Sequence, residues 1–321
     1  MNTLQDVLHA LQKAQRVAIF THLNPDGDAL GSSLAMRAAL LSIHKEATVF
    51  LEKPAPKRYD FLQPVCVLEG NAADFDVALA LDCGSMDRLG TLQPLFQAIK
   101  LQLVVDHHES DAPFGDIYYT DPGAAACCEL VYVLIRELCG GLPTETLAPL
   151  YTGLSTDTGH FKYSNVTPKT FRMAADLLEN GLEPRPITRV LYDTVKLEKL
   201  KFNGTLGERV QLFDDGKIAV LNCPDSLLES FCLLPEDMEE LPNTVLSIEG
   251  VQVSVVIKTK SENQLKISLR CKENVDLAAL SAQFGGGGHK CAAGFVTTLS
   301  ATEITARLVK VITKQLEEMH V

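Results

Sequence analysis

The stretch VVDHHES, residues 104–110, indicates both a fold class and the place of a functional site. Its two β-branched residues favour a strand that ends at Asp106, and His107 and His108 follow directly. In an open α/β sheet, functional groups gather outside the carboxyl ends of the strands. We therefore predict that residues 101–106 form a buried strand of a parallel sheet, and that the acid and the two imidazoles lie at its functional edge.

The first half of the chain repeats this pattern of short apolar strands and helices. Further elements are predicted as strands at 16–22, 47–51 and 77–82 and as a helix at 29–43. Such apolar runs are typical of strands that are buried on both faces, as in a parallel sheet. Their alternation with helices predicts an α/β layered domain, which continues as mostly helical chain after Gly123.

The second half changes to strands with alternating polarity, which are typical of antiparallel pairing. These strands are predicted at 216–223, 251–259 and 264–271, followed by a helix at 276–284, a glycine run, a strand at 292–298 and a helix from about 301. We therefore predict an N-terminal α/β domain at 1–190, a connector at 191–205 and a smaller α+β domain at 206–321.

Length and composition indicate a cytoplasmic globular protein. A chain of 321 residues is long for a single core, so two domains are expected. No apolar run approaches the ~20 residues that cross a bilayer, and the N-terminus does not resemble a secretory signal. The nine cysteines include no CxxC pair, which favours reduced thiols over a disulfide framework.

The charge balance restricts the partners that the protein can have. The net charge of −12 and the pI of about 5.1 argue against a protein that coats long DNA or RNA through many phosphate contacts. A small anionic substrate remains compatible with this charge if local positive charge is present. Bound metal ions could supply that charge.

Acids and imidazoles follow three of the predicted strands, and a fourth polar segment follows a helix. The residues after the strands are His22, Asp26, Asp28, Asp82, Asp106, His107 and His108, and the fourth segment adds Asp157 and His160. Taken singly, the NPDGD segment at 24–28 is typical of a turn, and a lone Asp at a strand end is typical of a helix cap. Taken together, the clusters predict one polar site, because capping does not require histidines.

Several carboxylates this close together would repel one another, and bound cations are the usual solution. A set rich in aspartate with two or three histidines suits Mn²⁺ best, with Mg²⁺, Co²⁺ or Fe²⁺ as alternatives. About six such ligands can hold two metals that share one carboxylate, an arrangement that activates water and clamps a phosphoryl group.

Five motifs resemble the signature of the DHH phosphoesterase superfamily and of its DHH-associated C-terminal domain. In chain order they are THLNPDGDALGS at 21–32, LDCGSMDR at 81–88, VVDHHES at 104–110, STDTGHFKYSN at 155–165 and FGGGGHKCAAGF at 284–295. The resemblance covers nearly the whole chain, and the wording is most similar to the nano-RNase/pAp phosphatase (NrnA-type) branch.

The resemblance implies a set of metal ligands. One Mn²⁺ is expected on His22, Asp26 and Asp82, and the other on Asp28, Asp82, His107 and Asp157, with Asp82 bridging. His108 is expected to face the substrate phosphate as a donor or acid. Asp106 is expected to orient His107 from behind, and His160 is not at a ligand position of the family.

In the second domain, the resemblance places Arg270 and His289 at positions that bind substrate phosphate. The glycine run supports an anion site on physical grounds as well, because the amides of Gly286, Gly287 and Gly288 can approach an anion closely. The segment from 258 to 290 carries six Lys or Arg against three acids, so this face is locally basic.

The resemblance implies a two-metal hydrolase whose substrate lies in a cleft between the domains. Expected substrates are RNAs of a few nucleotides, linear dinucleotides such as pApA and pGpG, and the monoester pAp. The alternative is an inorganic pyrophosphatase or short-chain exopolyphosphatase of the same superfamily. A RecJ-like single-strand DNA exonuclease and a catalytically inactive nucleotide-binding regulator are further alternatives, and a homodimer is possible.

Overall fold

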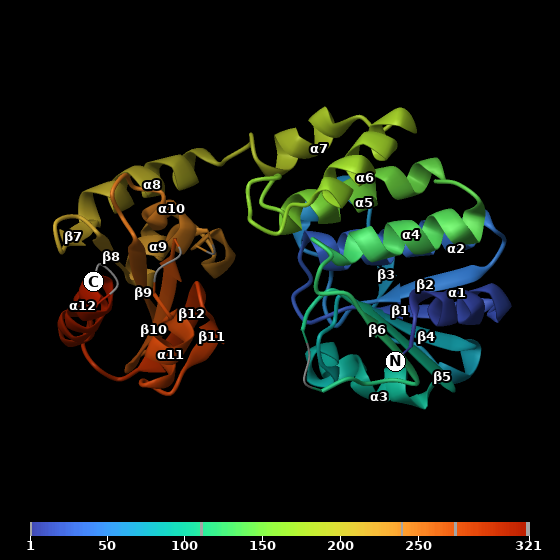
Figure 1. Cartoon of the computed structure of the whole chain (residues 1–321), viewed down its shortest axis with the longest axis horizontal. Coiled ribbons are helices and arrows are strands. Elements are labelled where there is room, and N and C mark those ends of the chain that lie inside the picture. Colours follow the sequence, from blue (N-terminus) through green and yellow to red (C-terminus); the bar gives the residue numbers. More distant parts are fainter. Residues whose placement is uncertain (1, 110–111, 239, 273–274, 319–321) are drawn as a thin grey trace. The chain divides into compact units, whose positions relative to one another are not determined.

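The computed structural model describes residues 2–109, 112–238, 240–272 and 275–318. The chain divides into two compact units, Met1–Thr194 and Val195–Val321 (Figure 1). No helix in the described part of the chain is both long enough and apolar enough to span a membrane.

The first unit is built on a six-stranded sheet in which all neighbouring strands are parallel, in the order β3-β2-β1-β4-β5-β6. The strands are β1 Arg16–Phe20, β2 Glu46–Phe50, β3 Cys66–Val67, β4 Val77–Leu81, β5 Leu101–Asp106 and β6 Ile117–Thr120. The predicted parallel α/β domain is thereby confirmed. The short edge strands β3 and β6 were not predicted.

Helices cover both faces of this sheet (Figure 1). They are α1 Leu4–Lys13, α2 Gly27–Ser42, α3 Gln93–Ala98, α4 Cys127–Cys139, α5 Thr144–Asp157, α6 Pro168–Glu179 and α7 Pro184–Leu191, with 3-10 turns at Lys57–Leu62, Ala72–Asp74 and Met86–Leu92. Alternate residues of each strand enter two separate cores. In β1, Ile19 packs into the core with α1, α2, α4 and α5, whereas Phe20 packs with Phe96 of α3 on the other face.

Because both faces of the sheet are covered, the central strand β4 is apolar throughout. All five of its residues, Val-Ala-Leu-Ala-Leu, are buried. In β1 and β5, its neighbours, polar side chains lie only near the strand ends, which is where the predicted site residues begin. This layering explains why the apolar runs of the sequence identify the strands so directly.

The second unit contains a six-stranded mixed sheet in the order β11-β12-β10-β9-β8-β7. Its strands are β7 Gln211–Phe213, β8 Ile218–Cys223, β9 Val253–Ser261, β10 Gln264–Cys271, β11 Gly287–His289 and β12 Ala292–Thr297. Its helices are α8 Leu197–Arg209, α9 Asp225–Ser230, α10 Leu241–Leu246, α11 Leu277–Ala282 and α12 Ala301–Glu318, with a 3-10 turn at Pro235–Met238. The predicted α+β character of this unit is confirmed.

One pairing in the second unit differs from the antiparallel pattern that the sequence suggested. Strands β8 and β9 are parallel, whereas β9–β10 and β10–β12 are antiparallel. The chain between β8 and β9 forms α9 and α10, and such a crossover returns the second strand in the same direction as the first. Two cores lie on opposite faces of the sheet, one with α11 and α12 and one with α8, α9 and α10.

Candidate active site

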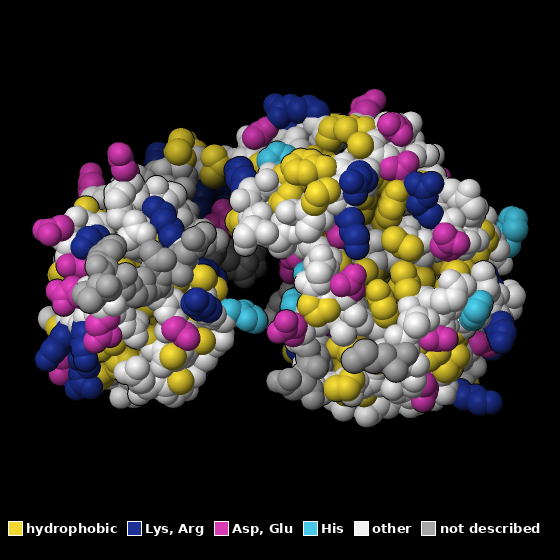
Figure 2. Space-filling model, viewed as in Figure 1, with side chains coloured by type: hydrophobic (Ala, Val, Ile, Leu, Met, Phe, Trp, Pro, Cys, Tyr) yellow, Lys and Arg dark blue, Asp and Glu magenta, His cyan; other side chains and the backbone are white. Residues whose placement is uncertain are grey.

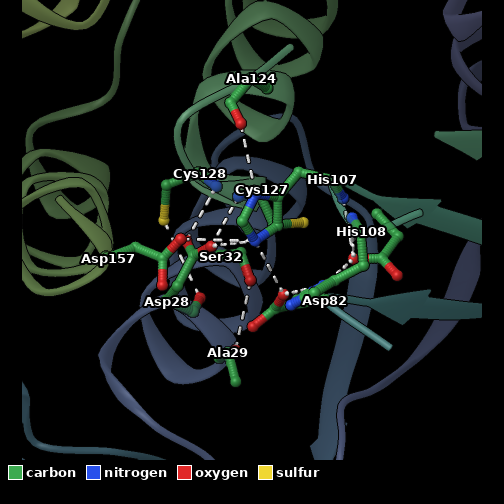
Figure 3. Close-up of polar contacts among 12 residues, drawn as sticks. Asp28, Ala29, Ser32, Asp82, His107, His108, Ala124, Cys127, Cys128 and Asp157 are labelled. Atoms are coloured by element: carbon green, nitrogen blue, oxygen red, sulfur yellow. Dashed lines mark hydrogen bonds and ion pairs between the residues drawn. The ribbon is translucent and has the colours of Figure 1, made fainter. Parts of the chain in front are cut away.

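The predicted acids and imidazoles gather at the carboxyl ends of three neighbouring strands, β1, β4 and β5, together with the start of α2 and the end of α5 (Figure 3). Three groups of ligand atoms lie close enough together to hold a metal ion, and their members are His22, Asp26 and Asp82, then Asp28, His107 and Asp157, then Asp82, Asp106, His107 and His108. All six predicted metal ligands thus lie in one place.

His22 anchors the first group. Its Nδ1 lies 2.7 Å from the carbonyl oxygen of Leu23, which turns Nε2 toward the carboxylates. Nε2 lies 3.6 Å from Asp82 Oδ2 and 3.9 Å from Asp26 Oδ2. Burial lowers the pKa of His22, but the hydrogen bonds with Asp82 and with the Leu23 carbonyl outweigh this effect, so the pKa is raised overall.

His107 anchors the second group in the same manner. Its Nδ1 faces the carbonyl oxygen of Ala124 at 3.3 Å, and its Nε2 points into the carboxylates. Nε2 lies 3.4 Å from Asp157 Oδ2 and 3.9 Å from Asp28 Oδ2. A backbone carbonyl behind each imidazole thus presents one ring nitrogen of each histidine as a ligand.

Asp82 lies between the two groups. Its Oδ2 faces His22, whereas its Oδ1 lies 3.6 Å from His107 Nε2 and 3.5 Å from His108 Nδ1 and has no hydrogen-bond partner among the described residues. The residue is only 2% exposed, and its backbone φ of +55° is unfavourable for any residue with a side chain. A buried carboxylate with such an oxygen, lying between imidazoles of separate groups, fits a shared metal ligand.

Asp28 and Asp157 lie in surroundings that disfavour their charged forms. Burial raises the pKa of Asp157 to about 6; His107 counteracts this effect, whereas the charges of Asp82 and Asp26 add to it. Burial and the charges of Asp82, Asp157 and Asp26 hold the pKa of Asp28 well above its usual range. In the described part of the chain, none of these four aspartates pairs with a lysine or arginine, so cations fit the site.

Asp28 is fixed by the start of another helix. Its carboxylate, which is 1% exposed, accepts the backbone N–H of Cys127 at 2.5 Å and that of Cys128 at 2.9 Å (Figure 3). These are the first two residues of α4, and its N-cap Ala126 has no side chain that could bond them. Asp28 of α2 therefore caps α4. Its carboxylate is held both by its own helix and by the positive N-terminal end of α4.

Glycines allow α2 and α5 to approach closely enough to bring Asp28 beside Asp157. A Cβ on Gly153 would collide with Cys128 Sγ and would lie 2.7 Å from Asp28 Oδ1. A Cβ on Gly31 would collide with the carbonyl oxygen of Pro149 and would lie 3.0 Å from Gly153 N. Any larger side chain at Gly153 would therefore displace the Asp28 carboxylate.

Asp106 has a different partner from the one that was predicted. Its fully buried side chain lies 2.8 Å from His108 Nδ1, and it also accepts the backbone N–H of His107. Asp106 was predicted to orient His107, and it contacts only the backbone of that residue, whereas the ring faces the carbonyl oxygen of Ala124. The hydrogen bond to Asp106 is the main reason that the pKa of His108 is raised. The His108 side chain is 42% exposed, so its ring can meet a substrate.

Asn165 and His160 make contacts around the site that were not predicted from the sequence. Asn165 Nδ2 donates to the carbonyl oxygens of Ala125 and Asp157, which ties the end of α5 to the segment that precedes α4. His160 lies apart from the three ligand groups, with its Nδ1 3.2 Å from Ser155 Oγ. The same hydroxyl lies 2.9 Å from the Tyr192 hydroxyl. Asn165 is part of the quoted STDTGHFKYSN stretch, but its role depends on where the chain folds back.

In the second unit, Arg270 and His289 lie in one row across the sheet. Arg270 of β10 pairs with Ala292 of β12, and His289 of β11 pairs with the same Ala292 from the other side. Residues directly opposite one another in a sheet project from the same face, so both side chains share a face. Gly287, Gly288 and His289 are exposed, and Figure 2 shows a histidine and a basic side chain at the surface over β11 and β12.

Two family models match the chain. The model for the DHH family, N-terminal domain, matches residues 16–154, and the model for the DHHA1 domain matches residues 227–318. The first match spans all the predicted ligands except Asp157. The second contains Arg270, the glycine run and His289.

The chain is also similar to proteins of known name. A "Bifunctional oligoribonuclease and PAP phosphatase NrnA" of Thermus thermophilus is 29% identical, with 99% of this chain and 94% of the relative covered. A Bacillus subtilis protein of the same name is 26% identical, with 90% and 91% covered. The crystal structure of an exopolyphosphatase-related protein from Bacteroides fragilis is similar with a TM-score of 0.86 at 26% identity, covering 98% of this chain and 95% of that one.

The domain matches, the end-to-end similarity and the gathered ligand groups agree with the resemblance inferred from the motifs. The chain therefore belongs to the DHH family, carries a DHHA1 domain in its second half, and is a phosphoesterase.

Proposed function

We propose that this protein is a two-metal phosphodiesterase that hydrolyses very short oligoribonucleotides, linear dinucleotides such as pApA and pGpG, and the monoester pAp. The observation that carries the proposal is the position of Asp82, whose two oxygens face two separate groups of ligands. The name of the Thermus and Bacillus relatives supports the substrate class.

One ion would be held by His22, Asp26 and Asp82, and the second by Asp28, Asp82, His107 and Asp157. Four carboxylates and two imidazoles suit Mn²⁺, and Mg²⁺ or Co²⁺ could take its place. When bound, two such ions activate a water molecule and neutralise charge on the phosphoryl group. The strand ends, the Leu23 and Ala124 carbonyls and the α4 amides fix the ligands before any ion arrives.

His108 would donate a proton to the oxygen that leaves phosphorus. Asp106 holds its Nδ1 side, so the opposite ring nitrogen is available to a substrate. The hydrogen bond with Asp106 raises the pKa of His108, which favours the protonated ring that a general acid requires.

The second domain would bind one end of the substrate. We assign residues 1–190 to catalysis, 191–205 to a connector and 206–321 to substrate binding. Arg270 and His289 would contact a terminal phosphate from their shared row, and the amides of Gly286, Gly287 and Gly288 would add neutral donors. A protein that binds only one end of its substrate contacts few phosphates at once, which is compatible with the net charge of −12.

The alternative activity, an inorganic pyrophosphatase or short-chain exopolyphosphatase, is less well supported. The Thermus relative, which is named as an oligoribonuclease and PAP phosphatase, aligns over 99% of this chain. We further propose a cytoplasmic location, since all nine cysteines are free and free thiols suit a reducing compartment. A homodimer remains a prediction.

A substrate panel with Mn²⁺, with and without chelator, tests the proposal. The panel contains a dinucleotide, a five-mer RNA, a long RNA, pAp, cyclic di-AMP and pyrophosphate. We expect turnover of the dinucleotide, the five-mer and pAp, little turnover of long RNA, and none with chelator. Turnover of pyrophosphate alone would establish the alternative, and binding of nucleotides without turnover of any substrate would refute an enzymatic role.

A further inference from the structure

Two cysteines lie opposite one another at the place where the Arg270 strand meets the glycine hairpin. Cys271 is the last residue of β10, and Cys291 belongs to the two-residue turn between β11 and β12. The antiparallel register that pairs Arg270 with Ala292 continues through this pair. Its backbone hydrogen bond confirms the alignment, since Cys271 N–H donates to the Cys291 carbonyl oxygen at 3.1 Å.

The geometry of this pair suits a disulfide. Opposite residues of an antiparallel ladder that share a backbone hydrogen bond, as these two do, have Cα atoms about 5.5 Å apart, within the range of about 4.4 to 6.8 Å that disulfides span. The Cys291 thiol lies near enough to add to the rise in the pKa of Cys271 that burial causes. The Cys271 thiol also contacts the carbonyl oxygens of Val275 at 3.3 Å and Lys290 at 3.8 Å, which hold it toward the hairpin turn.

We propose that Cys271 and Cys291 form a reversible disulfide that fastens the tip of the β11–β12 hairpin to the end of β10. Cys271 follows Arg270 in β10 and Cys291 lies two residues after His289, so the bond would lie next to this row along the chain but on the opposite face of the sheet, toward the core with α11 and α12. The sheet register alone brings the two cysteines together for this disulfide. Its effect on substrate rests on the proposed function, in which these two residues bind a terminal phosphate.

The chemistry is thiol–disulfide exchange with a small disulfide of the glutathione type. Cys291 is partly exposed, whereas Cys271 is buried and burial raises the pKa of its thiol to about 11, so Cys291 reacts first. The Cys291 thiolate attacks one sulfur of the small disulfide and releases one small thiol. Cys271 then loses its proton and attacks the Cys291 sulfur, which closes the protein disulfide and releases the second small thiol. Two protein thiols are oxidised and one small disulfide is reduced.

The bond would change the row that holds Arg270 and His289. Bonded sulfurs are about 2.05 Å apart, closer than two thiols in hydrogen-bonding contact, so the turn must move toward β10. His289 precedes that turn and would shift relative to Arg270. If one charge-assisted hydrogen bond to the terminal phosphate is lost, the KM for a dinucleotide rises about tenfold.

To test the proposal, the whole protein is treated with oxidised glutathione and digested without reduction, and its peptides are identified by mass spectrometry. We expect a cross-linked peptide that contains Cys271 and Cys291, and its loss on treatment with dithiothreitol. Cys271→Ser should retain a glutathione adduct on Cys291, whereas Cys291→Ser should form neither adduct nor cross-link at this place. Cys232→Ser is the matched control, because Cys232 is exposed and remote in sequence, and it should leave the cross-link unchanged.

A protein whose Cys271 and Cys291 both stay free under these conditions would overturn the proposal, as would a Cys291 that stops at the glutathione adduct in the wild type. The kinetic arm compares the oxidised and reduced protein on a dinucleotide and on a small aryl phosphodiester, with both serine variants as redox-insensitive references. A cross-link without a change in KM would establish the disulfide and would overturn its proposed effect on the row of Arg270 and His289, while the role of these residues is tested separately by Arg270→Ala.

Discussion

The two candidate sites of this protein are built in contrasting ways. In the first unit, the ligands extend from the ends of buried strands, and backbone groups fix them, as the Leu23 carbonyl fixes His22 and the α4 amides fix Asp28. In the second unit, His289 and its glycines lie exposed on a strand of three residues. The candidate metal ligands are thus positioned by the core of the fold, whereas His289, proposed to bind the substrate end, depends on a short surface hairpin.

The largest expected effect on activity is at Asp82, because this single carboxylate faces both candidate ligand groups of the first unit. Asp82→Asn should reduce turnover to the level of the chelated protein, because a neutral amide with a single oxygen cannot serve both ligand groups. Asparagine is the suitable replacement, since it tolerates the positive φ of this position better than alanine does. Turnover and bound Mn²⁺ are measured together, and the nearby exposed Asp87→Asn serves as control. Near-normal turnover in Asp82→Asn would rule out the bridging role.

Metal removal should destabilise the first unit in a pH-dependent manner. The pKa of Asp157 is raised from 3.8 to about 6, so the folded state disfavours its charged form. The metal-free protein should therefore lose about 3 kcal/mol of unfolding free energy as pH rises from about 4 to above 6. Thermal unfolding across this window, with chelator and with Mn²⁺, measures the difference. We expect Asp157→Asn to flatten the profile, and an equally steep loss in that variant would assign it to other groups.

Gly153→Ala probes how strictly the fold positions a ligand. The added Cβ would lie 2.7 Å from Asp28 Oδ1, so the carboxylate must move. We expect Mn²⁺ affinity to fall about 10- to 100-fold, as for other losses of ligand support. Titration with Mn²⁺ measures this, and Gly141→Ala is the control, because nothing lies within 4 Å of its added Cβ. Unchanged affinity would mean that the helices yield instead of the carboxylate.

Arg270→Ala should give the smallest effect and should separate the two sites. We expect the KM for a dinucleotide to rise about tenfold, the loss of one charge-assisted hydrogen bond. A small aryl phosphodiester, which has no second end to bind, should be affected little. Lys266→Ala removes a charge from the same strand and is the matched control. Equal losses on both substrates would show that Arg270 does not bind the substrate end.

The sequence predicted most of the fold and the gathered ligands, because both follow from where apolar runs end. His22, Asp82 and His107 each come shortly after a strand that the core must bury, so their neighbourhood was foreseeable. Contacts that depend on loop paths were not. The partner of Asp106 is decided by how residues 106–108 turn, and the parallel pairing of β8 with β9 is decided by the helices between them.

The capping of α4 by Asp28 has a practical consequence for genetics. An Asp28 variant would lose a candidate ligand and would also leave the first two amides of α4 without their acceptor, so it is expected to lower the amount of folded protein in cells as well as activity. A failed complementation by such an allele would be ambiguous. An allele changed at Asp82 leaves that helix terminus intact, which makes it the better tool for separating the need for catalysis from the need for the polypeptide.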